Sequence, residues 1–324
     1  MPLLLSAADV EAALPMNTAV DVLEEAFRMF AAGAFSMPQR LVMPHPDGIL
    51  AAMPAGDEQV MAIKVVTVHR SNPATRHLPA VQALVLLLDA ASGEPLAILD
   101  GTMLTLVRTS AASAVATRHL ANPGPTVLGV LGSGPLAVWH VRAMAAVRPL
   151  SEVRMWSPRL LSRWPEVTRS LAGLEVKIVQ AGGPEAVVRG ANLLVLATSA
   201  TAPVIDWRWV SPGTHINAVG SHAPAHRELD TETVARSRVV CDSVEACWAE
   251  AGDLIIPAQE GRLAPDAPVA LGDVLRGRAA GRSAQPEVTV FKSVGLAFED
   301  LWSARHAWKQ ARDRALGTRW DVTP

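Results

Sequence analysis

A glycine turn between an apolar run and a helix-compatible segment most constrains how this chain can fold. Residues 126–139 read TVLGVLGSGPLAVW, and the β-branched, apolar run breaks at the GSGP turn of residues 132–135. Gly132 permits a tight turn, Gly134 lets the backbone approach a pyrophosphate, and the proline suits the first helical position. The amide groups and dipole of the next helix then face an anion. With Ala137 in place of the third glycine, the segment predicts a dinucleotide-binding βαβ unit.

Strands and helices alternate after this turn. The strand candidates are residues 153–156, 175–180, 192–198 and 214–220, and the helix candidates are residues 158–172 and 184–190. Such alternation predicts an α/β Rossmann fold with a doubly wound parallel sheet. The alternative is a glycine turn in another kind of α/β sheet.

Upstream, strand candidates follow one another without helices between them, which predicts an antiparallel sheet. Two helices precede these strands: a short one near Ala7 that Ser6 caps, and an amphipathic one at residues 17–33 that Asn17 caps. The strand candidates are residues 39–43, 48–53, 60–68, 81–89 and 95–99.

Two further helices set the predicted domain boundaries. One begins at about residue 103 and leads into the dinucleotide-binding part, and another over residues 297–316, stopped by Gly317, returns to the first part. We therefore expect two domains: an α+β domain of residues 1–118 with 297–324, and a Rossmann domain of residues 119–296.

The end of the second Rossmann strand bears on the choice of cofactor. An acidic residue roughly 20 positions after the glycines normally holds the ribose 2′-hydroxyl of NAD. Here residues 155–159 read MWSPR, without a carboxylate. Ser157 and Arg159 are suited to a 2′-phosphate, and Trp156 or Arg159 to stacking on adenine. This favours NADP(H), with NAD(H) as the alternative; Arg159 as a plain exposed helix-start residue is the competing interpretation.

Composition excludes several classes of function. The chain has 324 residues and a net charge of −2, so no basic face for a nucleic acid is expected. No stretch approaches the roughly 20 apolar residues that span a membrane, and no signal peptide is recognised at the N-terminus. Cys241 and Cys247 have no metal-type partners nearby, so we expect reduced structural cysteines in a cytoplasmic protein that binds no metal.

Several blocks of sequence together resemble the ornithine cyclodeaminase/mu-crystallin family. They occur in family order across nearly the whole chain, which makes the resemblance far more specific than the glycine turn alone. The blocks are IKVV at residues 63–66, LPAVQ at 78–82, LDGT at 99–102, RTSAA at 108–112, PGTHINAVG at 212–220, RELD at 227–230, DS at 242–243, EAGDL at 250–254 and VFKSVG at 290–295.

The resemblance implies a substrate site and an assembly. The family's first domain binds the substrate and forms a homodimer through its antiparallel sheet, and the active site lies in the cleft between domains. The family's basic residues for an amino or imino carboxylate correspond to Arg40, Lys64 and Arg108. Charge-assisted donors suit such a ligand, and arginine offers a two-pronged fork. Lys64 stands inside an apolar strand, where an unpaired cation would be costly.

Cofactor contacts are also implied by the resemblance. Gly132 and Gly134 would face the pyrophosphate, and Leu136 stands where the family often has Gln, which removes a polar contact at the helix start. The remaining positions carried over are Thr109, Ser133, Ala197, Thr198, Asn217, Val219 and Lys292, the last near the nicotinamide.

Position 222 departs from the cyclodeaminases of the family. They carry an Asp after the NAVG strand, where it handles the substrate amine, and here the loop reads Gly220-Ser221-His222. Histidine donates or accepts protons near neutral pH, so His222 suits protonation of an imine nitrogen. The competing interpretation is that His222 only caps its loop.

We therefore expect an NAD(P)H-dependent oxidoreductase that reduces a small cyclic ketimine carboxylate, of the Δ1-pyrroline-2-carboxylate or Δ1-piperideine-2-carboxylate type, to the cyclic amino acid. Lys64 and His222 are the expected catalytic residues. The alternatives are ornithine cyclodeaminase, which forms proline and ammonia, an alanine-type dehydrogenase, and a non-catalytic NADP-binding protein.

Overall fold

The computed structural model describes residues 1–321, which form two compact units. Unit 1 contains Met1–Thr109 and the segment that begins at Gly295, and unit 2 contains Ser110–Val294. The long helix α4 (Gly101–Leu120) begins in unit 1 and ends in unit 2. The domain boundaries expected from the sequence, between residues 118 and 119 and between residues 296 and 297, stay a prediction.

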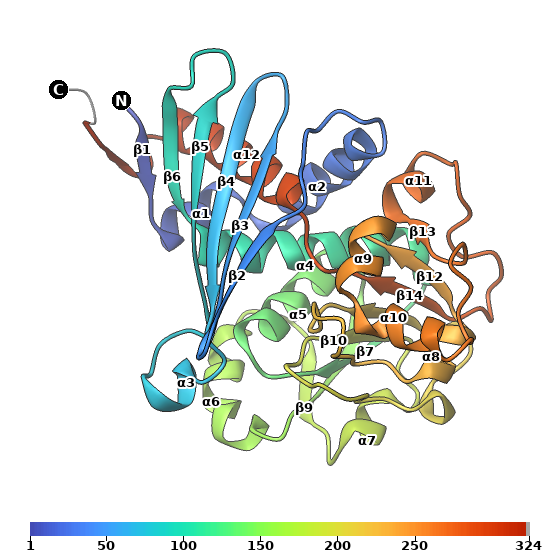
Figure 1. Cartoon of the computed structure of the whole chain (residues 1–324). Coiled ribbons are helices and arrows are strands. Elements are labelled where there is room, and N and C mark those ends of the chain that lie inside the picture. The colour runs from blue at the N-terminus through green and yellow to red at the C-terminus, as the bar shows by residue number, and fades with distance from the viewer. Residues whose placement is uncertain (322–324) are drawn as a thin grey trace. The chain divides into compact units, whose positions relative to one another are not determined.

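Unit 1 is built on a seven-stranded mixed sheet (Figure 1). Its order is β15-β1-β6-β5-β4-β3-β2, in which β1 pairs with β6 in parallel and all other neighbours are antiparallel. The strands are β1 (Leu3–Leu5), β2 (Leu41–His45), β3 (Gly48–Gly56), β4 (Val60–Val68), β5 (Val81–Asp89), β6 (Pro95–Asp100) and β15 (Thr318–Arg319).

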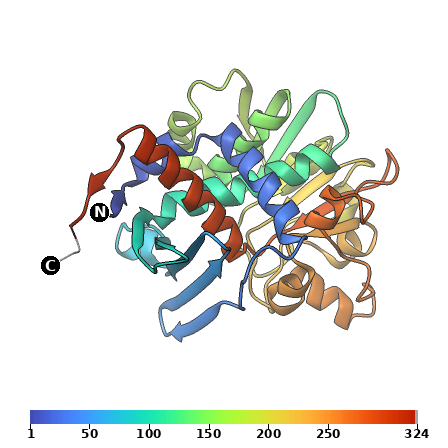
Figure 2. The same ribbon diagram turned by 90° about the horizontal axis from the view of Figure 1, so that it is seen from above.

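The two faces of this sheet differ. Along β4, Ala62, Lys64 and Val66 are buried, whereas Met61 and Val65 on the opposite face are exposed, because successive side chains point to opposite faces. The buried face packs against α12 (Ala297–Asp313), which also lies against α1 (Ala7–Ala13) and α2 (Met16–Phe30), as Figure 2 shows from above. The short helix α3 (Asn72–Thr75) lies between β4 and β5 in the chain.

Unit 2 is a doubly wound sheet of eight parallel strands in the order β13-β12-β14-β11-β10-β7-β8-β9. From β7 the chain passes to β8 and β9 on one side and then to β10 and β11 on the other, which makes the β7/β10 junction the switch point where open sheets bind nucleotides. The strands are β7 (Thr126–Leu131), β8 (Leu150–Trp156), β9 (Lys177–Gln180), β10 (Leu193–Leu196), β11 (His215–Ala218), β12 (Arg238–Cys241), β13 (Val269–Ala270) and β14 (Thr289–Lys292).

Short helices connect these strands. Across residues 1–321, no helix is both long enough and apolar enough to cross a membrane. The helical elements of unit 2 are α5 (Pro135–Val147), α6 (Leu160–Ser170), α7 (Pro184–Val188), the 3₁₀ turn η1 (Trp207–Trp209), α8 (Thr231–Ala235), α9 (Val244–Glu250), α10 (Gly252–Gln259) and α11 (Leu271–Leu275).

The predicted ends of two helices are wrong. The second helix begins at Met16 after Pro15 and ends at Phe30 rather than at residue 33, so Asn17 lies inside it and caps nothing. The last helix ends at Asp313, not 316: Ala315 takes the left-handed conformation (φ 56°), and the Leu316 amide donates to the Ala311 carbonyl, as in a Schellman motif. The cap at Ser6 is confirmed, since its hydroxyl accepts from the Asp9 amide in a capping box.

Candidate functional site

Lys64 and Arg108 meet two carboxylates in the interior of unit 1. Lys64, on β4, places Nζ 2.7 Å from Asp300 Oδ2, and Arg108, on α4, places Nε 2.9 Å from Asp300 Oδ1. A second nitrogen of Arg108, Nη1, lies 2.8 Å from Glu299. Lys64 and Arg108 are 2% and 4% exposed, so these are buried ion pairs in which each charge depends on its partners.

The start of α12 supplies both carboxylates. Glu299 and Asp300 lie in its first turn, and Glu299 also accepts from the Leu296 amide, which fixes the first turn of the helix. Just before it, Gly295 has φ 75°, and a Cβ atom there would lie 2.5 Å from Arg108 Nη1. A glycine is therefore required both by the backbone conformation and by the close approach of the guanidinium.

Arg40 completes the group that the sequence predicts. It lies immediately before β2, is half-buried, and donates to the Gly295 carbonyl. Its Nη1 is 3.9 Å from the Sδ atom of Met53, and Met53 pairs with Lys64 across β3 and β4. The structure thus brings Arg40, Lys64 and Arg108 together, and we call these three residues the basic cluster.

Charged groups are densely packed in this site. Lys64 and Arg108 are ion-paired with Glu299 and Asp300, and the third cation, Arg40, lies beside them at the Gly295 carbonyl. Burial, followed by the positive charge of Arg108, lowers the pKa of Lys64 to about 8, although Asp300 opposes this. Burial would raise the pKa of Asp300, but Arg108 and Lys64 outweigh it and hold that pKa below its usual value. Three basic side chains gathered in one place are suited to an anionic ligand.

Sequence reasoning identified the cations but missed Glu299 and Asp300. Their signal was an acidic pair at the start of the last helix, where acidic residues are common because they favour the helix dipole. Only the fold reveals that both carboxylates face the basic cluster from a distant part of the chain.

The glycine turn of unit 2 has the form that a dinucleotide needs. Gly132 ends β7 with φ 129°, and a Cβ atom there would lie 2.5 Å from the Ala197 carbonyl oxygen. Gly134 is the N-cap of α5, no side chain caps that helix end, and a Cβ at Gly134 would meet nothing within 4 Å. The open, positively polarised helix start fits the pyrophosphate of a dinucleotide cofactor.

A second polar group lies beside the turn. Ser157 follows β8, and its hydroxyl donates to Ser133 Oγ at 2.7 Å. Trp156 is half-buried and Arg159 is exposed, and no carboxylate stands in residues 155–159. These residues fit the adenosine end of a dinucleotide, with serine and arginine as the donors.

Other predicted cofactor residues occupy two kinds of environment. Ala197, Thr198 and Val219 follow β10 and β11 at the carboxyl edge of the sheet. Asn217 and Lys292 are fully buried: Asn217 donates to Thr117, and Lys292 pairs with Asp253 at 2.8 Å. Thr109 is buried on α4, and Leu136 is half-buried in the first turn of α5. Direct cofactor contact by these residues stays a prediction.

His222 belongs to the loop that follows β11. It is half-buried, whereas the Ser221 hydroxyl beside it is buried and donates to the His226 carbonyl. Two other histidines of unit 2, His140 and His215, are fully buried, and burial lowers their pKa values to about 4 and about 3. Both are therefore neutral at pH 7, which leaves them unsuited to donate a proton.

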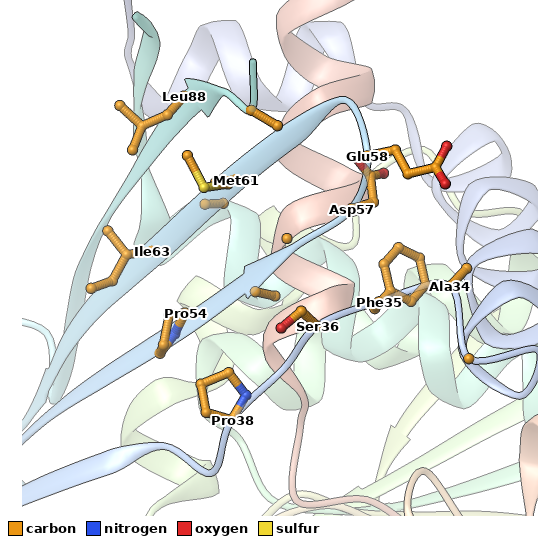
Figure 3. A pocket seen from close by; sticks show the side chains of 15 residues that line it. Ala34, Phe35, Ser36, Pro38, Pro54, Asp57, Glu58, Met61, Ile63 and Leu88 are labelled. Atoms are coloured by element: carbon orange, nitrogen blue, oxygen red, sulfur yellow. The ribbon is translucent and has the colours of Figure 1, made fainter. Parts of the chain in front are cut away.

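A pocket of about 780 Å³ lies in unit 1, away from these charges (Figure 3). Met61, Ile63 and Leu88 line it from the face of the sheet opposite α12, together with the loop after α2. Its fifteen lining residues do not include the basic cluster.

Over residues 1–321, no group of three or more His, Cys, Asp or Glu side chains is arranged to hold a metal ion.

Comparisons with known proteins agree with this geometry. A Δ1-pyrroline-2-carboxylate reductase of Bacillus cereus is 34% identical over 329 residues, covering 98% of this chain and 99% of the relative. The solved structure of Thermococcus litoralis Δ1-pyrroline-2-carboxylate reductase in complex with NADH and L-proline is similar with a TM-score of 0.91 and 35% identity, over 98% of this chain and 100% of that one. An archaeal alanine dehydrogenase dimer with bound NAD is similar with a TM-score of 0.92 and 31% identity, over 99% of both chains.

The family model for ornithine cyclodeaminase/mu-crystallin matches residues 1–316. This range includes the basic cluster, its two carboxylates and the glycine turn, so the resemblance expected from the sequence blocks is confirmed. The chain belongs to the ornithine cyclodeaminase/mu-crystallin family.

Proposed function

We propose that this protein is an NAD(P)H-dependent reductase of a small cyclic ketimine carboxylate, of the Δ1-pyrroline-2-carboxylate or Δ1-piperideine-2-carboxylate type. The observation that carries the proposal is the convergence of three basic side chains, those of the basic cluster, on one site. Charge-assisted donors of this kind suit a carboxylate, and the similar proteins of Bacillus cereus and Thermococcus litoralis are Δ1-pyrroline-2-carboxylate reductases.

The basic cluster binds and orients the substrate carboxylate. Arg40, Lys64 and Arg108 donate charge-assisted hydrogen bonds, while Asp300 holds Lys64 and Arg108 in place. The side chain of Met53 lies beside Arg40, which gives the site an apolar surface suited to ring methylenes. Because Glu299 and Asp300 are already paired, they do not offer a carboxylate to the second ammonium group of ornithine.

Reduction of the imine needs a hydride at the α-carbon and a proton at the nitrogen. A nicotinamide cofactor held at the glycine turn would supply the hydride. His222 donates the proton to the nitrogen, so that the C=N double bond becomes a C–N single bond and the product is the cyclic amino acid, proline in the five-membered case. Lys64 contributes by holding the substrate carboxylate as the charge on nitrogen changes.

We assign NADP(H) as the preferred cofactor, with NAD(H) as the alternative. The donors Ser133 and Ser157, with the exposed guanidinium of Arg159 nearby in the chain, suit the extra 2′-phosphate. The solved structures of the Thermococcus litoralis reductase and of the archaeal alanine dehydrogenase contain NADH and NAD, so the preference rests on these residues of this chain alone.

We also propose a homodimer formed through the open face of the sheet in unit 1. Met61, Val65 and Leu84 are 38%, 40% and 59% exposed on that face, and an apolar surface of this kind is typical of a protein–protein interface. The apolar pocket of Figure 3 continues the same face.

We further propose a cytoplasmic location. The buried, unbridged Cys241 and Cys247 agree with a cytoplasmic location.

The main test measures oxidation of NADPH and of NADH with Δ1-pyrroline-2-carboxylate and Δ1-piperideine-2-carboxylate. We expect turnover of at least one imine and a loss in kcat of about 100-fold or more in His222→Ala, since that is the usual contribution of a positioned proton donor. His119→Ala, an exposed histidine elsewhere, is the control and should retain full activity. Ammonia release from ornithine without net cofactor oxidation would instead identify a cyclodeaminase, and oxidation of alanine alone an alanine-type dehydrogenase.

The lowered pKa of Lys64 predicts an alkaline limb in the pH profile. Lys64 is cationic below its pKa of about 8 and neutral above it, so kcat/KM for the imine carboxylate should fall as pH rises through about 8. Steady-state kinetics between pH 6 and about 10 measure this. Lys64→Arg stays charged over that range and should lose the limb, so an unchanged limb in this variant would refute the assignment to Lys64.

Cofactor preference is tested by Arg159→Ala. Loss of a charged contact to the 2′-phosphate should raise KM for NADPH by about tenfold or more and leave KM for NADH within about twofold. Arg163→Ala, on the helix α6 that Arg159 precedes, is the matched control, since Arg163 is paired with Glu166. Equal effects on both cofactors, or a wild-type preference for NADH, would overturn the assignment of NADP(H).

Assembly is tested by analytical ultracentrifugation. We expect a dimer for the wild type and a monomer for the double variant Val65→Glu, Leu84→Glu, because two buried charges in the interface would be unpaired. Leu161→Glu changes an exposed leucine of α6 in unit 2 and should remain dimeric. A monomeric wild type at micromolar concentration would contradict the proposed homodimer.

A further inference from the structure

A buried polar network lies at the carboxyl edge of the sheet in unit 2, apart from the residues to which the mechanism assigns a step. Its members are Glu228, Asp253 and Lys292, each fully buried. Ionisable groups rarely occupy an interior unless their interactions with one another are needed there. The contacts of each group show what the network holds.

Glu228 joins the loops that follow two neighbouring strands. Its Oε1 accepts from the amide of Thr198 at 2.8 Å and from the hydroxyl of Thr198 at 2.7 Å. Its Oε2 accepts from the amide of Gly220 at 2.7 Å. Thr198 follows β10 and Gly220 follows β11, so one carboxylate fixes the spacing of the two loops.

Asp253 and Lys292 bond to the backbone of the two segments that contain Glu228 and Ser221. Asp253 Oδ1 accepts from the amides of Glu228 and Leu229 at 2.7 and 2.9 Å, which fixes the backbone that carries Glu228. Lys292 Nζ lies 2.8 Å from Asp253 Oδ2 and donates to the carbonyl of Ser221 at 2.6 Å. Lys292 therefore bonds to the residue directly before His222.

Close packing leaves this loop little freedom. A Cβ atom at Gly220 would lie 2.2 Å from the Thr198 carbonyl oxygen and 2.5 Å from Glu228 Oε1. At Gly252 it would lie 2.3 Å from the His226 carbonyl oxygen and 2.6 Å from that of Pro224. The segment from Gly220 to His226 is thus held by hydrogen bonds at its start and by tight contact at its end.

We propose that Glu228, Asp253 and Lys292 are positioning residues that hold His222 at the orientation required for proton transfer. This inference rests on the role proposed above for His222. Lys292 then acts through the Ser221 carbonyl, and Glu228 acts through the Gly220 amide, so neither needs to touch the cofactor.

Glu228→Gln is the sharpest test. The amide oxygen of Gln still accepts from Thr198, but its NH₂ group must then face the Gly220 amide, and two donors cannot bond to each other. We expect kcat to fall at least tenfold with KM for the imine within about twofold, and Tm to change by no more than a few degrees. Glu232→Gln, on α8 and at the surface, is the matched control.

A double-mutant cycle with His222→Ala separates positioning from general structural damage. If Glu228 acts through His222, Glu228→Gln should have no further effect on kcat in the His222→Ala background. An equal loss in both backgrounds would overturn the inference.

If the Glu228→Gln variant does not fold, the same measurements are made on Asp253→Asn. The amide oxygen of the new Asn side chain retains the bonds from the Glu228 and Leu229 amides, while the ion pair to Lys292 is lost.

Hydrogen exchange of residues 219–226 gives a readout independent of activity. Exchange in this segment should rise at least tenfold in Glu228→Gln and remain unchanged in Glu232→Gln. Unchanged exchange would overturn the inference even if the reductase activity is as proposed. Faster exchange together with a fully active His222→Ala variant would show that the network holds the loop and that the proposed role of His222 is wrong.

Discussion

The buried contact among Lys64, Arg108 and Asp300 is the interaction on which unit 1 depends. One carboxylate, at the start of α12, joins that helix to the strand β4 and to the helix α4. Removal of one partner from such a group leaves an uncompensated buried charge, which typically costs about 3–5 kcal/mol of stability. The second carboxylate, Glu299, pairs with Arg108 from the same helical turn. The contacts that stabilise the fold therefore also fix the orientation of two residues of the basic cluster.

The part of the fold that local pattern determines was predictable from the sequence. β4 and β5 have the predicted bounds, because alternating or continuous apolar residues give strands a strong signal. The glycine turn was recognised because its geometry admits few residues. By contrast, β1, at Leu3–Leu5, was not predicted, since three apolar residues carry no periodicity and the strand exists only through its pairing with β6.

The candidate site was also predictable from the sequence only in part. Lys64 was conspicuous as a cation in an apolar strand, but the carboxylates that pair with it lie far along the chain at Glu299 and Asp300. Glu228 appeared only as one letter of a family block, and its contacts with Thr198 and Gly220 depend on how two strands, β10 and β11, end side by side. Residue type reveals which groups are unusual, whereas the pairing of those groups depends on tertiary structure.

The position of α12 in the sequence has a consequence for biosynthesis. Its first turn supplies both carboxylates that pair with the basic cluster, yet it begins at residue 297, after the whole of unit 2. A ribosome therefore releases the three cations and the whole of unit 2 before either counter-charge has left the exit tunnel. Until then β4 carries a lysine that cannot be buried without a partner. The nascent chain can complete unit 2 early, whereas unit 1 must wait until α12 has been translated.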